Sequence, residues 1–273
     1  MKREVGRLAL LLAPAAIVFC AFWLLPMARI AVLGAEGPHG LAAYSAIITD
    51  ARYFNALVST VTLSIVVTVA TVIISGIAGL FLAHNRFPGR ALLTAMLTLP
   101  LAFPGVVVGF MVIMLGGRQG LIANLAHQLF DVRAVFAYSI AGLFAGYLYF
   151  SIPRVILTMI AAMEKLDPAL EEAARSLGAG PLRVLIDVVI PALKPAVISS
   201  SAICFATSMG AFGTAFTLAT RINVLSLVIY TDFTYGADFV MAAAMSIVLG
   251  AITWLVLALA RTLAGSTVAA AGG

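Results

Sequence analysis

The side chains that could do chemistry in this sequence gather between positions 165 and 196, in a chain of which 63% is hydrophobic and only 10% charged. Asp167 followed by Pro168 is typical of a helix start, because the carboxylate can accept a hydrogen bond from a free backbone N–H and proline fits the first helical position. Glu171, Glu172 and Arg175 follow within two turns. Charges on a short helix between hydrophobic stretches favour recognition by another protein, and we identify no catalytic residue and no metal ligand among them.

The same stretch predicts two short helices joined by a hinge. Apolar residues recur at i, i+3, i+4 and i+7 and form one face of the first helix, namely Leu170, Ala173, Ala174 and Leu177. Gly178 suits the left-handed residue that ends a helix. Gly180 and Pro181 start the second helix, and Pro191 and Pro195 are expected to break it as the chain returns to hydrophobic sequence.

The spacing in this stretch resembles a known signature. Glu172-Ala173-Ala174 is followed after three residues by Gly178, after nine more by Val188, and after one more by Ile190-Pro191. This is similar to the EAA motif of permease subunits in binding-protein-dependent ABC importers, although Val188 and Ile190 stand where that family favours Ile and Leu. The resemblance extends from about Asn55 to Arg261. A plain cytoplasmic loop helix is the alternative interpretation.

The resemblance implies that residues 161–194 form a cytoplasmic coupling loop that inserts into a groove on a separate ATPase. The residues expected to make this contact are Leu170, Glu171, Glu172, Ala173, Ala174, Leu177, Gly178 and Pro191. ATP and Mg²⁺ would then be held by the partner, and this chain would carry no cofactor. The implied partners are a dimer of ATPase subunits, a second permease subunit of the same or a different kind, and an external solute-binding protein.

The composition indicates a polytopic membrane protein, since a chain with a mean hydropathy of +1.13 cannot present a water-compatible surface. Lipid is therefore the expected surrounding, and the net charge of +5 does not indicate nucleic-acid binding. We expect an all-α protein with six membrane spans at about residues 8–33, 55–82, 92–115, 134–160, 195–218 and 239–263. Residues 1–54 would form an N-terminal helix with an external segment, 55–264 the permease core and 265–273 a short tail.

The distribution of basic residues predicts the orientation. With both termini in the cytoplasm, 11 of the 16 lysines and arginines fall inside, Arg154 among them. This bias agrees with the positive-inside rule. The predicted location is the bacterial inner membrane.

The sequence lacks the residues that several activities require. There is no P-loop, so the chain cannot hydrolyse ATP by that route, and we expect it not to be an enzyme. His39, His84 and His127 are interpreted as solvated loop residues. With Arg154 assigned to the cytoplasmic side, we expect no charged residue in the middle of the second, third, fourth or sixth span, which weighs against a proton-coupled carrier.

Residues that line a solute pathway are predicted from helix breaks and from polar or aromatic residues within spans. A break around Pro100 and Pro104 would free backbone carbonyls within the membrane, which is tolerated where the backbone lines a cavity. The candidates are Pro100, Phe103, Pro104, Tyr147, Tyr149, Thr207, Ser208 and Met209. The alternatives are that the aromatic residues pack or face lipid and that the hydroxyls bond their own helix.

These observations predict the fold of a type I ABC importer permease that takes up a small hydrophilic solute. The resemblance is to polyamine-type systems, which import spermidine or putrescine. Phosphonate, ferric iron, thiamine and sulfate are alternative solutes. An ion-coupled secondary transporter, a channel subunit and a membrane scaffold are alternative classes.

Overall fold

The computed structural model describes residues 2–36, 41–218 and 223–264, and all regular secondary structure within these ranges is helical. The predicted tail 265–273 and His39 lie outside the described residues. The α-helices are α1 (Lys2–Phe19), α2 (Leu25–Leu33), α3 (Ala42–Thr49), α4 (Ala51–His84), α5 (Arg90–Thr98), α6 (Gly105–Gly116), α7 (Leu121–Phe130), α8 (Ile140–Glu164), α9 (Pro168–Ser176), α10 (Pro181–Val184), α11 (Ile190–Met209), α12 (Phe212–Leu218), α13 (Leu225–Thr234) and α14 (Phe239–Ala264). Two π-helices, η1 (Cys20–Leu24) and η3 (Leu185–Val189), and the 3₁₀ helix η2 (Leu99–Ala102) connect them.

Six helical stretches in the described ranges are long and apolar enough to cross a membrane, which confirms the predicted number. They are Leu11–Leu33, Ala51–His84, Gly105–Phe130, Ile140–Glu164, Pro181–Met209 and Phe239–Ala264. Large apolar side chains on them lie on the outside, for example Phe22, which is 80% exposed. An outer surface of this kind needs lipid or partner helices around it.

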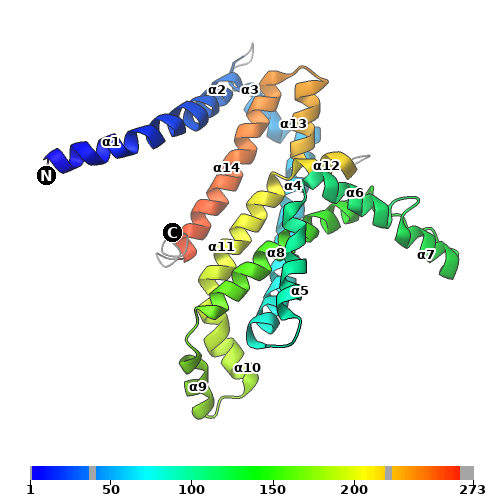
Figure 1. Ribbon diagram of the computed structural model, residues 1–273. Helices are drawn as coiled ribbons and strands as arrows, with labels where there is room; N and C mark the ends of the chain where they lie inside the picture. The colour runs from blue at the N-terminus through cyan, green and yellow to red at the C-terminus, as the bar shows by residue number, and fades with distance from the viewer. Residues whose placement is uncertain (1, 37–40, 219–222, 265–273) are drawn as a thin grey trace.

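Helix α4 is the centre of the bundle and packs against α8 and α11 (Figure 1). Its inner face carries small hydroxyl residues at helical spacing, all of them buried: Thr60, Ser64, Thr68, Thr71 and Ser75. Small residues let membrane helices approach closely. At Gly79 the approach is so close that an added Cβ would lie 2.7 Å from the Cβ of Met159 on α8.

The third span is broken, as predicted from its prolines. Helix α5 passes into η2, the chain is extended at Phe103 and Pro104, and α6 then begins. The break places the backbone of residues 99–105 beside α8.

The prediction that Pro191 and Pro195 break the helix that starts at Pro181 is wrong, and so is the start of the fifth span at about residue 195. The helix runs from Pro181 to Met209 through α10, η3 and α11. Proline disrupts an α-helix because its ring collides with the carbonyl four residues earlier. For Pro191 that carbonyl belongs to Asp187, which lies in the widened π turn of η3. We attribute the continuation of the helix through Pro191 to this wider turn, which relieves the collision. Pro195 lies within α11, after the π turn.

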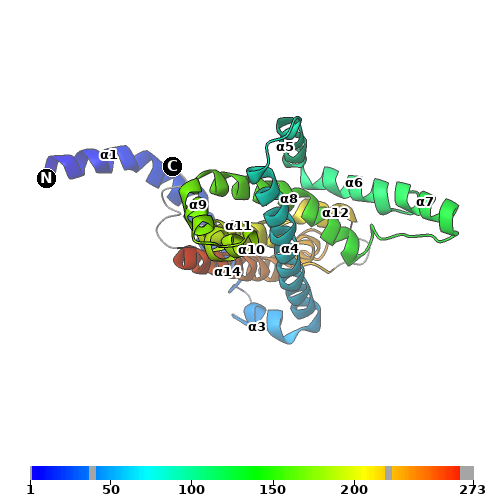
Figure 2. The same cartoon turned by 90° about the horizontal axis from the view of Figure 1, so that it is seen from below.

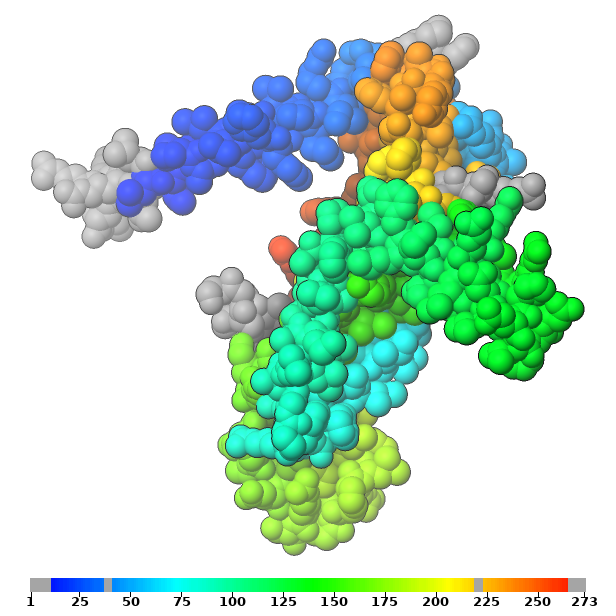
Figure 3. All heavy atoms as spheres, turned by 45° about the vertical axis from the view of Figure 1, so that its right-hand side comes forward, coloured from blue at the N-terminus to red at the C-terminus, as the bar shows by residue number. Residues whose placement is uncertain are grey.

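Two arms leave the bundle in opposite directions (Figure 2). One is formed by α1, η1 and α2, and no described side chain of Leu11–Leu33 is buried. The other is formed by α6 and α7, and α7 was not predicted, since it lies between the expected third and fourth spans, 92–115 and 134–160. Helices α9 and α10 form a knob at one end of the bundle (Figure 3).

Candidate functional site

The knob begins with a capped helix, as the sequence predicts. The Asp167 carboxylate accepts a hydrogen bond from the backbone N–H of Ala169 at 2.9 Å, and Pro168 is the first helical residue. This cap satisfies one of the N–H groups that a helix start leaves free. Helix α9 therefore begins at a fixed point directly after the end of α8.

The end of α9 is fixed by Gly178, which adopts the predicted left-handed conformation with φ of +86°. The Gly178 N–H donates to the Arg175 carbonyl at 2.9 Å and the Ala179 N–H donates to the Ala174 carbonyl at 3.1 Å. These two bonds form a Schellman motif. Glycine suits the position because a left-handed backbone is strained for residues with a Cβ.

The predicted apolar face of α9 is divided between the chain's own core and the outside. Ala174 packs against a buried cluster of Met163, Val184, Val189 and Leu193. Leu170 and Leu177 point away, and Leu177 is 88% exposed. Leu182 and Ile186, on the following helix, are also exposed. The knob therefore presents leucine and isoleucine side chains that nothing in the described chain covers.

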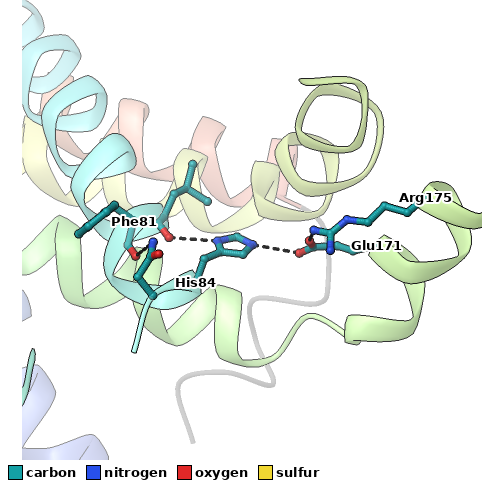
Figure 4. Close-up of polar contacts among 6 residues, drawn as sticks. Phe81, His84, Glu171 and Arg175 are labelled. Atoms are coloured by element: carbon teal, nitrogen blue, oxygen red, sulfur yellow. Dashed lines mark hydrogen bonds and ion pairs between the residues drawn. The ribbon is translucent and has the colours of Figure 1, made fainter. Parts of the chain in front are cut away.

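Glu171 ties α9 to the end of α4 (Figure 4). Its Oε1 lies 3.1 Å from Nε2 of His84, and its Oε2 accepts a bond from Nη2 of Arg175 at 3.1 Å. The other ring nitrogen of His84 lies 3.0 Å from the carbonyl oxygen of Leu80. Both nitrogens face acceptors, so both bonds form only when the ring carries two protons.

The interpretation of His84 as a loop residue was wrong, since it is the last residue of α4, although its side chain is exposed as expected and also meets Glu171. No local pattern could reveal a contact between residues 87 positions apart. Glu172, the neighbouring carboxylate, is exposed on the knob, as is Pro191 on the following helix.

A cavity of about 280 Å³ lies where the break in the third span and the end of α11 meet α8. Three of the eight predicted pathway residues line it: Pro100, Phe103 and Thr207. The remaining lining residues are Leu101, Gly105, Phe150, Arg154, Ala211, Gly213 and Thr214. The lining contains one charged side chain, and within the described ranges no three His, Cys, Asp or Glu side chains gather so that they could hold a metal ion.

The other pathway candidates lie beside this cavity rather than in its lining. Tyr147 is buried and donates from its hydroxyl to the Ala211 carbonyl at 2.7 Å, so it braces the break after α11. Ser208 and Met209 are buried, Tyr149 is half-buried and Pro104 is exposed. Thr207 lines the cavity while its hydroxyl bonds the Ile203 carbonyl of its own helix at 2.9 Å, which is the alternative predicted for such hydroxyls.

Arg154, which was counted among the cytoplasmic residues, lies inside the fourth apolar stretch. It lies within α8, ten residues before the end of that helix at Glu164, which corresponds to about 15 Å along the axis. Its Nη1 atom is buried without a hydrogen-bond partner. The prediction of a fourth span without a charged residue in its middle is wrong, because Arg154 lies well inside the stretch Ile140–Glu164. The missed signal was the apolar sequence on both sides of Arg154, from Ile140 to Met163.

Comparison with known proteins identifies the family. The profile of the binding-protein-dependent transport system inner membrane component matches residues 75–266. The chain is 36% identical over 166 residues to the molybdenum transport system permease protein ModB of Escherichia coli K12, which covers 59% of this chain and 72% of ModB. It is 30% identical over 253 residues to the sulfate transport system permease protein CysT of Salmonella typhimurium, covering 89% of this chain and 88% of CysT.

The fold agrees with this similarity. A chain in the crystal structure of a bacterial ABC transporter involved in alginate import superposes with a TM-score of 0.79 at 20% identity, covering 96% of both chains. The match to the family profile spans more than half of the sequence, including the knob and the cavity. The chain belongs to the family of binding-protein-dependent transport system inner membrane components.

Proposed function

We propose that this chain is the permease subunit of an ATP-driven importer that couples to a separate ATPase through residues 161–194. The observation that carries the proposal is the knob, a capped helix that exposes Leu170 and Leu177 outside the membrane-spanning stretches. Uncovered apolar side chains on a rigid element are typical of a docking surface. The resemblance of this segment to the EAA motif supports the same role.

Two connections lead from the knob into the membrane. One is the pair of Glu171 and His84, which joins α9 to α4. The other is the continuous helix from Pro181 to Met209, which has 29 residues and a length of about 43 Å. It passes Thr207 at the cavity just before its end. Displacement of the knob by an ATPase that closes on ATP would therefore tilt a helix that borders the cavity.

The partners follow from the family. Solute would arrive from an external binding protein, and the pathway would form between this chain and a second permease subunit, which would cover the exposed arms. The basic bias of the sequence supports cytoplasmic termini. ATP and Mg²⁺ would be bound by the ATPase subunits, not by this chain.

The solute class proposed here is a small oxyanion. ModB and CysT are named for molybdenum and sulfate transport, and molybdenum exists in neutral water as an oxyanion. Uptake of a polyamine stays a prediction from the resemblance, and neither relative bears such a name.

Reconstitution tests the proposal. The permease, its ATPase and its binding protein are placed in proteoliposomes with labelled sulfate, molybdate or spermidine. We expect oxyanion uptake that requires both ATP and the binding protein. Uptake driven by an ion gradient without ATP would contradict the proposal. Uptake of spermidine and of neither oxyanion would show that the solute is a polyamine.

A further inference from the structure

Arg154 is an unusual residue for its place in the fold. It lies in a helix that is apolar enough to span the membrane, about 15 Å along the axis from the end of α8 and about 21 Å from its start. A charged side chain at such depth is costly, so it is retained where it faces a cavity and has a function. The cavity of about 280 Å³ at the break in the third span and the end of α11 is what Arg154 faces.

The charge of Arg154 is not neutralised by the described part of the chain. None of the ion pairs between described residues includes it, and no carboxylate lines the cavity. Its Nη1 is buried without an acceptor. An unpaired buried donor on a charged group is expensive, and an arriving anion would remove that cost.

The remaining lining suits an anion held by a single charged contact. Phe103, Phe150 and Pro100 form apolar walls, which strengthen a charge-assisted hydrogen bond by keeping the local dielectric low. At about 30 Å³ per water, the volume corresponds to roughly nine water molecules. That is enough space for a small tetrahedral anion with part of its hydration shell.

We propose that the Arg154 guanidinium binds an oxyanion solute during its passage through this cavity. The planar fork of N–H donors matches the oxygen spacing of sulfate-like groups. The same charge repels a polyamine. This inference rests on the proposed importer function and adds the residue that would select the solute.

Uptake by the reconstituted complete transporter is the first test, with labelled sulfate and molybdate as probes. Arg154→Gln should reduce uptake of the transported oxyanion roughly 10- to 100-fold, as expected when a hydrogen bond to a charged group is lost. Arg154→Lys should reduce it less, because the charge remains without the fork. The matched control is Arg133→Gln, an exposed arginine outside the cavity, which should import at the wild-type rate.

The outcomes separate the two proposals. If the wild type imports an oxyanion and Arg154→Gln imports it equally well, the inference about Arg154 is overturned while the importer function stands. If the wild type imports spermidine and neither oxyanion, the proposed solute class is wrong and this inference falls with it.

A second measurement leaves Arg154 unchanged, so it does not depend on the folding of an Arg154 variant. Thr207→Cys is introduced into the complete transporter after Cys20 and Cys204 are replaced by alanine. A negatively charged thiol reagent should label the cysteine at position 207 roughly tenfold faster than a positively charged one, because a cavity lined by one sign of charge concentrates counter-ions. Addition of the transported oxyanion should slow this labelling. Equal or faster labelling by the cationic reagent would overturn the inference.

Discussion

Replacing Gly178 by valine would perturb the backbone of the hinge that ends α9. Gly178 has φ of +86°, and an added Cβ would have no heavy atom within 4 Å. The substitution therefore causes no collision, and its cost is the strain of a left-handed β-branched residue, about 1–2 kcal/mol or more. The two Schellman bonds would be lost as the backbone relaxes, and the exposed Leu170 and Leu177 would be turned from their present direction.

Gly180→Val is the matched control for this substitution. Gly180 lies in the same hinge, an added Cβ there also meets nothing within 4 Å, and its backbone is extended with φ of −69° and ψ of 165°. Valine adopts such a conformation readily, so the same side chain is added without the left-handed strain.

The assay is ATP-dependent solute uptake together with co-purification of the ATPase. A strain of 1–2 kcal/mol lowers the population of the native hinge by a factor of roughly 5–30, so Gly178→Val should reduce uptake by a similar factor and Gly180→Val should reduce it little. Normal uptake and normal ATPase retention in Gly178→Val would refute the reasoning that the hinge fixes the orientation of Leu170 and Leu177 toward the ATPase.

Three further predictions concern docking, packing and orientation. Glu172→Lys should weaken co-purification of the ATPase by less than about 1 kcal/mol, since an exposed charge pair contributes little, and a larger loss than in Gly178→Val would reverse the predicted order. Gly79→Ala should destabilise the contact of α4 with Met159 on α8 by about 1–3 kcal/mol. Gly76→Ala is the control and should cause no such loss, because an added Cβ there meets nothing. Equal thermal stability of the two purified variants would contradict this prediction. A reporter fused to the C-terminus that is active only on the external side of the membrane should show no activity, and activity would overturn the predicted orientation.

The features that the sequence predicted correctly are those set by neighbouring residues. The cap at Asp167, the left-handed Gly178 and the break at Pro100 to Pro104 depend on local backbone chemistry. The number of spans depends on local hydropathy, although the third and fifth spans have other bounds than predicted. For the same reason the division of the apolar face of α9 could not be read from spacing alone, because it depends on where the buried cluster beside Ala174 lies.

The features that were missed depend on contacts between distant segments or on rare geometry. The pair of Glu171 and His84 joins residues from different helices. The fifth span continues past Pro191 because the wider π turn accommodates the proline ring, and π turns have no reliable sequence pattern. The position of Arg154 inside the fourth apolar stretch was missed because it was counted with the basic residues of the cytoplasmic side, although the sequence around it is apolar.

Crosslinking from Leu177 tests the central claim most directly, namely that the knob docks on the ATPase. A single cysteine is placed at Leu177, or as a control at Phe130, which is similarly exposed at the end of α7, in the transporter whose Cys20 and Cys204 are replaced by alanine. Each variant is treated with a thiol-to-amine crosslinker in membranes that contain the active complex. We predict that the cysteine at position 177 captures the ATPase subunit and that the one at position 130 does not. A fully active transporter in which position 177 never captures the ATPase would contradict the account.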